Sequence, residues 1–181
     1  MGANRVRIIG GAWRRRLVSF PDANGLRPSP DRVRETLFNW LGQGLIRRAC
    51  LDLFAGSGVL GLEAASRGAD PVVLVESNRA AAAALRENAM RLGATQVEVV
   101  QGDALEFVRR DVRLYDVVFL DPPFSKNLIP AILPLVRSRL APDARVYVES
   151  AAPVLVETPW QVLRRGKAGQ VHYQLLALEG P

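Results

Sequence analysis

The sequence has a single cysteine and a single histidine among its 181 residues, and only 7% of its residues are aromatic. Cys50 has no partner for an internal disulfide, so we expect a buried, reduced thiol of the kind found in cytoplasmic proteins. One cysteine and one histidine, His172, cannot supply the common zinc ligand sets, so we expect a structural histidine and no metal site. The chain also lacks a secretory signal and any apolar run of about 18 residues, which predicts no membrane span.

Lysine is nearly absent as well, since 22 of the 24 basic residues are arginine. The first 50 residues carry a charge of +7 and the remaining 131 carry −1, so the whole net charge of +6 arises near the N-terminus. Clustered positive charge favours binding to a polyanion over a merely solvated surface. The length predicts one domain, with residues 1–44 as an arginine-rich extension that contacts the polyanion. The candidate contacts are Arg5, Arg7, Trp13, Arg14, Arg15, Arg16, Arg32 and Arg34.

Two local patterns fill this N-terminal extension. The segment RVRIIGGAWRRRLVSF predicts a β-hairpin that turns at its Gly-Gly pair. The segment SPDRVRETLFNWL predicts a helix with Ser29 as N-cap and Pro30 in the first helical position. Arg32 and Arg34 lie off the apolar stripe of this helix, which predicts that both are exposed. Trp13 either stacks on the bound polyanion or anchors the hairpin to the core.

From residue 49 onward, apolar segments alternate with helical segments, which is typical of α/β proteins. The strands are expected in ACLDLF, PVVLVE, VEVV, YDVVFLD and ARVYVE, and the helices in residues 59–67, 79–92, 104–109 and 128–140. The final segment, WQVLRRGKAGQVHYQLLAL, predicts a hairpin that turns between Gly166 and Gly169. The fold class is therefore a doubly wound, mostly parallel seven-stranded sheet with an antiparallel edge. Ligands of such sheets bind at the carboxyl ends of the strands.

The first of these strands runs into a glycine-rich turn. Gly56, Gly58 and Gly61 form a GxGxxG pattern after the strand, and Glu76 ends the next strand 20 residues after Gly56. Glycines at this place let backbone N–H groups approach a ligand, and the glutamate can accept hydrogen bonds from ribose hydroxyls. The pattern predicts a cofactor that contains a nucleoside, and by itself it leaves NAD and S-adenosylmethionine (AdoMet) both open.

Acidic residues at two other strand ends favour AdoMet over NAD. Asp52 lies just ahead of the glycines, where it would suit an ammonium group and would be unfavourable beside a pyrophosphate. Asp103 could accept a hydrogen bond from an adenine amine, cap the helix that follows it, or do both. The candidate cofactor-binding residues are Asp52, Phe54, Gly56, Ser57, Gly58, Glu76, Ser77, Asp103 and Ala104.

The fourth of these strands ends in Asp121-Pro122-Pro123-Phe124. Two prolines give a stiff turn whose carbonyls are not consumed by a helix, because each proline fixes its own φ and restricts the residue before it. Asp121 and the Pro122 carbonyl could together accept hydrogen bonds from one amino group, and Phe124 could stack on a planar base. The turn therefore predicts catalytic roles for Asp121, Pro122 and Phe124 in chemistry at an exocyclic amine.

DPPF after a strand, with DLFAGSG ahead of it, resembles the class I AdoMet-dependent amino-methyltransferases. RIIGGAWRRRLVSFP and LRPSPDRVRETLFNWL resemble more narrowly the bacterial 16S rRNA guanine-N2 methyltransferases of the RsmD family. The resemblance implies a Rossmann-like class I methyltransferase domain over residues 1–181 and methyl transfer from AdoMet to N2 of one guanine in 16S rRNA. It also implies a substrate within the small ribosomal subunit or an assembly intermediate. Nothing in the sequence suggests more than a monomer, and the single cysteine is typical of a cytoplasmic enzyme.

Other functions remain open from the sequence alone. The same turn would suit transfer to N6 of adenine in DNA or RNA, or to a glutamine side chain. An NAD-linked oxidoreductase would bind NAD instead of AdoMet, and a non-catalytic factor would bind RNA without transferring a methyl group.

Overall fold

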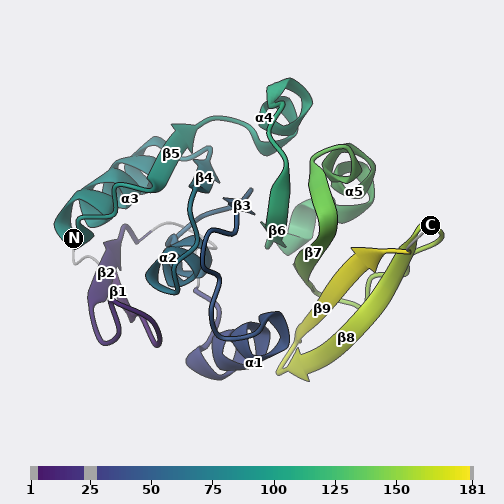
Figure 1. The fold of residues 1–181 in the computed structure, drawn as a ribbon, viewed down its shortest axis with the longest axis horizontal. Helices are drawn as coiled ribbons and strands as arrows, with labels where there is room; N and C mark the ends of the chain where they lie inside the picture. Colours follow the sequence, from purple (N-terminus) through teal and green to yellow (C-terminus); the bar gives the residue numbers. More distant parts are fainter. Residues whose placement is uncertain (1–3, 23–27, 180–181) are drawn as a thin grey trace.

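The computed structural model describes residues 4–22 and 28–179. Its centre is a seven-stranded sheet in the order β5-β4-β3-β6-β7-β9-β8 (Figure 1). The strands are β3 (Cys50–Asp52), β4 (Val72–Glu76), β5 (Val97–Gln101), β6 (Tyr115–Leu120), β7 (Leu140–Ser150), β8 (Trp160–Ala168) and β9 (Val171–Leu178). Strands β3 to β7 are mutually parallel, whereas β9 is antiparallel to β7 and β8. The predicted mostly parallel sheet with an antiparallel edge is confirmed.

Helices cover both faces of the sheet (Figure 1). One core joins the sheet to α1 (Asp31–Leu41), α2 (Val59–Ser66) and α3 (Arg79–Leu92), and the other joins it to α4 (Ala104–Arg110) and α5 (Ile129–Arg137). Residues 72–75 of β4 are all apolar because both faces of the strand are buried: Leu74 packs in the first core, and Val73 and Val75 pack in the second. Among the described residues, the helices are too short or too polar to cross a membrane.

The N-terminal hairpin has shorter strands and a longer connection than predicted. Strands β1 (Asn4–Arg7) and β2 (Leu17–Phe20) are antiparallel, and a nine-residue loop joins them in place of a tight Gly-Gly turn. The loop instead bonds to α2: the Ser66 hydroxyl donates to the Gly10 carbonyl at 2.6 Å and accepts from the Trp13 N–H at 2.9 Å. Gly11 has a φ of 73°, and a Cβ there would lie 1.9 Å from the Ser66 carbonyl oxygen. The glycines therefore permit docking on α2 and do not form the turn.

The start of α1 also differs from the prediction. Its N-cap is Pro30, which has no side-chain acceptor, and Ser29 lies one residue too early to cap the helix. The Ser29 hydroxyl instead donates a hydrogen bond to the carboxylate of Glu149, at the end of β7, at 2.5 Å. A charged acceptor forms a stronger hydrogen bond than a backbone amide can offer, so the serine ties α1 to β7.

The prediction that Arg34 is exposed was wrong. The side chain is fully buried. Its guanidinium donates to the Ser29 carbonyl at 3.1 Å and the Arg7 carbonyl at 2.9 Å, and it forms ion pairs with Glu63 at 2.6 Å and with Asp31 at 2.5 Å. A buried charge is tolerated when such partners satisfy it, and apart from Asp31, one turn earlier on α1, these partners come from other segments of the chain.

Glu63 of α2 completes a buried ionic cluster, the Arg34–Glu63–Arg67 cluster. Glu63 is fully buried and accepts hydrogen bonds from the N–H groups of Ile9 at 2.5 Å and Gly10 at 3.2 Å. Arg67 lies 3.5 Å from its second oxygen. Burial raises the pKa of Glu63, and these donors and cations oppose the rise. The cluster fastens the hairpin loop and α1 to the first helix after the glycine-rich turn.

Smaller boundary differences occur near the C-terminus. Helix α5 ends at Arg137, and Leu140 already begins β7. The last hairpin turns at Gly169, whose φ is 59°, whereas Gly166 lies within β8. A Cβ on Gly166 would lie 2.3 Å from the Tyr173 ring, so this glycine makes room for a tyrosine across the strands.

Candidate active site

Three carboxylates gather at the carboxyl edge of the sheet, on the face covered by α1. Asp52 ends β3 and pairs in register with Phe119 of β6, which pairs with Tyr147 of β7. Asp121 and Glu149 lie two residues beyond this row, so their side chains point to the same face. The Tyr147 hydroxyl donates to Glu149 at 3.0 Å, which agrees with that placement. The topology thus brings together residues almost 100 positions apart.

Asp52 is a buried acid with an unused oxygen. It is 1% exposed, and its Oδ2 accepts a hydrogen bond from the Gly61 N–H at 3.2 Å. Its Oδ1 is buried and receives no hydrogen bond from any residue that the structure describes. Burial raises the pKa of Asp52 to about 7, and the hydrogen bond from Gly61 opposes the rise. Such a group suits a ligand that brings a positive charge or a donor to this edge.

The glycine-rich turn and Glu76 form one side of a cradle. Gly56 and Gly58 have φ values of 51° and 78°, which favour glycine. The Gly56 N–H donates to Glu76 Oε2 at 2.8 Å, and the Asn78 N–H donates to Oε1 at 2.7 Å. A Cβ on Gly58 would lie 2.2 Å from the Leu85 methyl group of α3, so this glycine also permits close helix packing. Both carboxylate oxygens of Glu76 are therefore held by backbone N–H groups beside the glycine-rich turn.

The remaining cofactor candidates follow the ends of β3, β4 and β5. The Ser57 hydroxyl is buried and lies 3.4 Å from the Val59 N–H. Asp103 caps α4 by accepting the Glu106 N–H at 3.0 Å, which confirms the capping role considered for it. Phe54 is half-buried, Ser77 exposed and Ala104 buried. All of them lie along the same edge as Asp52 and Glu76.

In the Asp-Pro-Pro-Phe turn, one of the two proline carbonyls is used by the short helix that follows and the other is free. Pro123 accepts the Lys126 N–H at 3.0 Å as the short helix η1 (Phe124–Lys126) begins. No described N–H group takes the Pro122 carbonyl, so it remains available as an acceptor. The Phe124 ring is 39% exposed. Burial raises the pKa of Asp121 well above its usual range, and the nearby charges of Glu149 and Asp52 add to the rise.

Sequence analysis did not select Glu149. The residue is 3% exposed, and one of its oxygens accepts from both Ser29 and Tyr147. Burial raises its pKa, and these two hydrogen bonds oppose the rise. The sequence feature that could have identified Glu149 is an acid at the end of the apolar segment ARVYVE, at the same edge of the sheet as Asp52 and Asp121.

The arginine-rich surface lies around the hairpin and α1. Arg34 is buried, but the other arginine candidates, Arg5, Arg7, Arg14, Arg15, Arg16 and Arg32, are exposed. Arg7 also pairs with Asp31 at 3.3 Å. Trp13 is half-buried and packs against the first core, which favours the anchoring interpretation of this residue.

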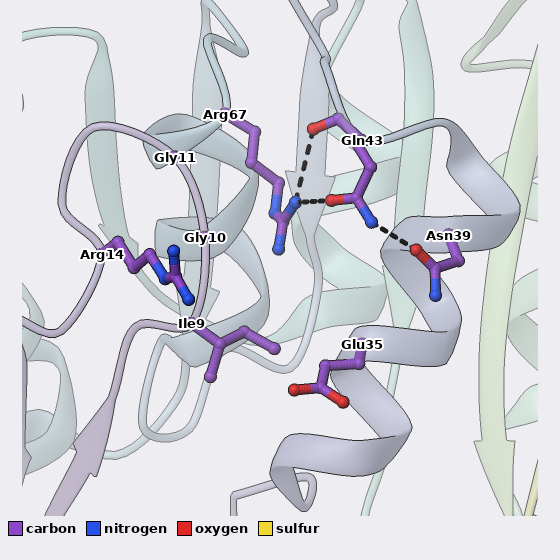
Figure 2. A pocket seen from close by; sticks show the side chains of 8 residues that line it. All are labelled: Ile9, Gly10, Gly11, Arg14, Glu35, Asn39, Gln43 and Arg67. Carbon is purple, nitrogen blue, oxygen red and sulfur yellow. Dashed lines mark hydrogen bonds between the residues drawn. The ribbon is translucent and has the colours of Figure 1, made fainter.

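A hollow of about 490 Å³ separates the hairpin loop from α1 (Figure 2). Arg14 projects toward it from the loop, while Arg67 is held by Gln43, which in turn bonds to Asn39 (Figure 2). The lining residues are Ile9, Gly10, Gly11, Arg14, Glu35, Asn39, Gln43 and Arg67. Five of these eight residues have polar or charged side chains, and the hollow lies within the arginine-rich surface. In residues 4–22 and 28–179, no three Cys, His, Asp or Glu side chains are arranged to hold a metal ion.

The chain is similar to known proteins over nearly all of its length. The family model described as "Conserved hypothetical protein 95" matches residues 6–177. The chain is 43% identical to ribosomal RNA small subunit methyltransferase D of Escherichia coli K12, over 98% of this chain and 92% of that protein. The protein of the same name from Haemophilus influenzae is 40% identical over 94% of this chain and 92% of its own length.

Solved structures give the same result. The putative methyltransferase yhhF from Escherichia coli superposes with a TM-score of 0.89 at 43% identity, covering 98% of this chain and 100% of that one. The putative methylase HI0767 from Haemophilus influenzae gives a TM-score of 0.83 at 38% identity, with coverage of 98% and 100%. The chain belongs to the ribosomal RNA small subunit methyltransferase D family, within the group described as "Conserved hypothetical protein 95".

Proposed function

We propose that this protein transfers a methyl group from AdoMet to the exocyclic N2 of one guanine in 16S rRNA. The observation that carries the proposal is the position of Asp121 and the free Pro122 carbonyl next to Asp52 and the glycine-rich turn. An amine acceptor site and a nucleoside cradle thus share one edge of the sheet. The similarity to named rRNA methyltransferases over 98% of the chain supports RNA as the substrate.

AdoMet fits the residues of the cradle. The unused, buried Oδ1 of Asp52 suits the ammonium group of the methionine part, and Glu76 suits the ribose hydroxyls. Asp103 would lie near the adenine while it continues to cap α4. When bound, AdoMet supplies an activated methyl group on a positively charged sulfur. NAD fits less well, because its pyrophosphate would bring negative charge toward Asp52.

Asp121 and Pro122 would prepare the amine for attack. The lone pair of guanine N2 is delocalised into the ring, so the free amine is a weak nucleophile. Two acceptors that take its hydrogens would pull it toward pyramidal geometry and direct the lone pair at the methyl group. The amine nitrogen would bond to the methyl carbon as the bond from that carbon to sulfur broke, and the proton released by the methylated amine would pass to solvent water, while Asp121 and the Pro122 carbonyl act as hydrogen-bond acceptors. Positioning of this kind can lower a barrier by about 7–11 kcal/mol.

The arginine-rich surface would hold the RNA. A guanine within a helix must be unpaired or flipped before it reaches the Asp121 site, which costs a few kcal/mol. Stacking on Phe124 would return about 1–3 kcal/mol, and phosphate contacts by the exposed arginines would supply the rest. The buried Arg34 is not part of this proposed contact set. We infer a monomer that acts in the cytoplasm, on the small ribosomal subunit or an assembly intermediate.

The proposal is tested with tritiated AdoMet and small ribosomal subunits from a strain that lacks the enzyme. We expect label in N2-methylguanosine after the RNA is digested, and primer extension would then map the guanine. Label in N6-methyladenosine would replace guanine with adenine as the substrate. RNA binding without label in any nucleoside would instead support a non-catalytic factor.

A further inference from the structure

A second hollow, of about 400 Å³, opens beside the Asp-Pro-Pro-Phe turn. One wall comes from Pro122, Pro123 and Phe124, and the opposite wall from the end of β7 and the residues that follow it. Its volume is within the range of small-ligand sites, and the half-exposed Phe124 ring lies at its wall. The hollow is therefore large enough for a flipped base, and the residues directly after Asp121 form one of its walls.

Glu149 is the one charged residue among those that line this hollow. Its Oε1 accepts from the Ser29 hydroxyl at 2.5 Å and from the Tyr147 hydroxyl at 3.0 Å. Two donors on one oxygen fix the orientation of the carboxylate. Its Oε2 receives no hydrogen bond from the residues that the structure describes, and it is not among the atoms sealed from solvent. One oxygen is thus anchored, and the other is available to a ligand.

Glu149 and Asp121 are neighbours across the sheet. Leu120 pairs with Val148 in register, so Asp121 and Glu149 occupy the next position on adjacent parallel strands. Strands in a sheet lie about 4.8 Å apart, which is wider than the spacing of neighbouring nitrogens on the edge of a base, so the two side chains would converge on the base from adjacent strands. If Asp121 accepts from an amine, Glu149 faces the atom beside that amine.

Guanine and adenine differ at that neighbouring atom. In guanine the amine is next to N1–H, a donor, whereas in adenine the amine is next to an N1 that only accepts. An ionised carboxylate only accepts hydrogen bonds, so it favours guanine and opposes adenine. Burial raises the pKa of Glu149 and the hydrogen bonds from Ser29 and Tyr147 oppose that rise; because both donors are on Oε1, Oε2 is the oxygen that would accept the N1–H.

We propose that Glu149 is a specificity-determining residue that accepts the N1–H of the target guanine. The inference rests on the proposed function, since it concerns the base that presents its amine to Asp121. It also explains one purpose of the N-terminal segment: Ser29, just before α1, orients a group that contacts the base.

The test compares two bases at the mapped position of reconstituted subunits, guanine and 2,6-diaminopurine. Both carry the reactive N2 amine, but N1 of 2,6-diaminopurine is an acceptor. We expect the wild-type enzyme to prefer guanine by about 10- to 100-fold in kcat/KM, because a mismatched buried acceptor pair costs that much. In Glu149→Gln the hydroxyl donors retain the amide oxygen, so the NH₂ group faces the base and the preference should fall at least tenfold or reverse.

Glu157→Gln is the matched control, because Glu157 is an exposed acid in the loop after β7, and its preference should equal that of the wild type. The ratio of two substrates on one enzyme does not depend on the fraction folded. An unchanged ratio in Glu149→Gln, or equal rates on both bases in the wild type, would overturn the proposal.

If Glu149→Gln is too slow on both bases, the ratio is measured in Tyr147→Phe. This variant loses one of the two donors that orient the carboxylate, and its ratio should fall by a smaller factor; no change there would also overturn the proposal. Failure of the proposed function would appear differently, as no N2-methylguanosine from the wild-type enzyme on unmodified subunits.

Discussion

Replacing Arg34 with alanine should destabilise the fold and leave RNA contacts nearly intact. The substitution removes the guanidinium that lies 2.6 Å from Glu63, and both side chains are fully buried. Breaking a buried ion pair by removing one partner typically costs about 3–5 kcal/mol, because the remaining charge is left without compensation. Arg67 stays 3.5 Å from the other Glu63 oxygen, and the N–H groups of Ile9 and Gly10 still donate. We therefore expect a loss near the lower end, about 3 kcal/mol.

The loss is measured by urea unfolding followed by circular dichroism. For a chain of this size it corresponds to a fall of about 6–12 °C in melting temperature. Arg32→Ala is the matched control, since Arg32 is exposed on the same helix, and it should change stability by less than about 0.5 kcal/mol.

Affinity for small ribosomal subunits, measured under conditions in which both variants are folded, separates a role in stability from a role in RNA binding. Arg32→Ala should weaken binding more than Arg34→Ala does. A loss of less than about 1 kcal/mol in Arg34→Ala, together with clearly weaker RNA binding, would refute the structural role assigned to the arginine.

The other predictions concern the acids at the sheet edge and the arginine loop. Asp121→Ala should reduce the rate of methyl transfer by more than tenfold with nearly unchanged AdoMet affinity. Asp121→Asn retains an acceptor oxygen and should stay active. A transfer rate within tenfold of the wild type in Asp121→Ala would exclude the proposed role. Burial raises the pKa of Asp52 from 3.8 to about 7, so the folded carboxyl holds its proton more tightly than the unfolded one, and its contribution to stability falls as the pH rises between these values. In Asp52→Asn, the free energy of unfolding of the ligand-free protein should therefore fall less with rising pH, by up to about 4 kcal/mol between these two values. An unaltered dependence of the unfolding free energy on pH would contradict a raised pKa for Asp52. Replacing Arg14, Arg15 and Arg16 together with alanine should reduce the slope of log affinity for RNA against log salt by about 2–3. Replacing Arg164 and Arg165, the exposed arginines of β8, is the control and should leave the slope unchanged. A slope equal to that of the wild type in the triple variant would mean that the loop does not contact phosphate.

The sequence predicted the features that depend on near neighbours along the chain. Segments apolar on both faces predict buried parallel strands, and the alternation with helices predicts the doubly wound order of layers. The glycine-rich turn, Glu76 and the two-proline turn were also recognised in this way, because each combines a local backbone constraint with a strand end. The structure bears out the sheet and the position of these groups at one edge.

Arg34 could not be assigned from the sequence. Helical periodicity places it off the apolar stripe, and its partner Glu63 lies 29 residues later on another helix. A charged residue is buried only when a partner meets it, so its environment depends on how α1 and α2 pack. The Gly10-Gly11 pair was misassigned for the same reason, because its constraint is the backbone of Ser66.

Glu149 shows most clearly what only the tertiary structure decided. Its own segment is an ordinary apolar strand that ends in an acid, and Ser29 resembles a helix cap 120 residues earlier in the chain. Strand order places β7 beside β6, and register then sets Glu149 beside Asp121. Local sequence therefore determined which residues could form turns, caps and strands. The pairing of strands and the packing of α1 determined which acids meet, because contacts between distant segments exist only once the sheet has formed.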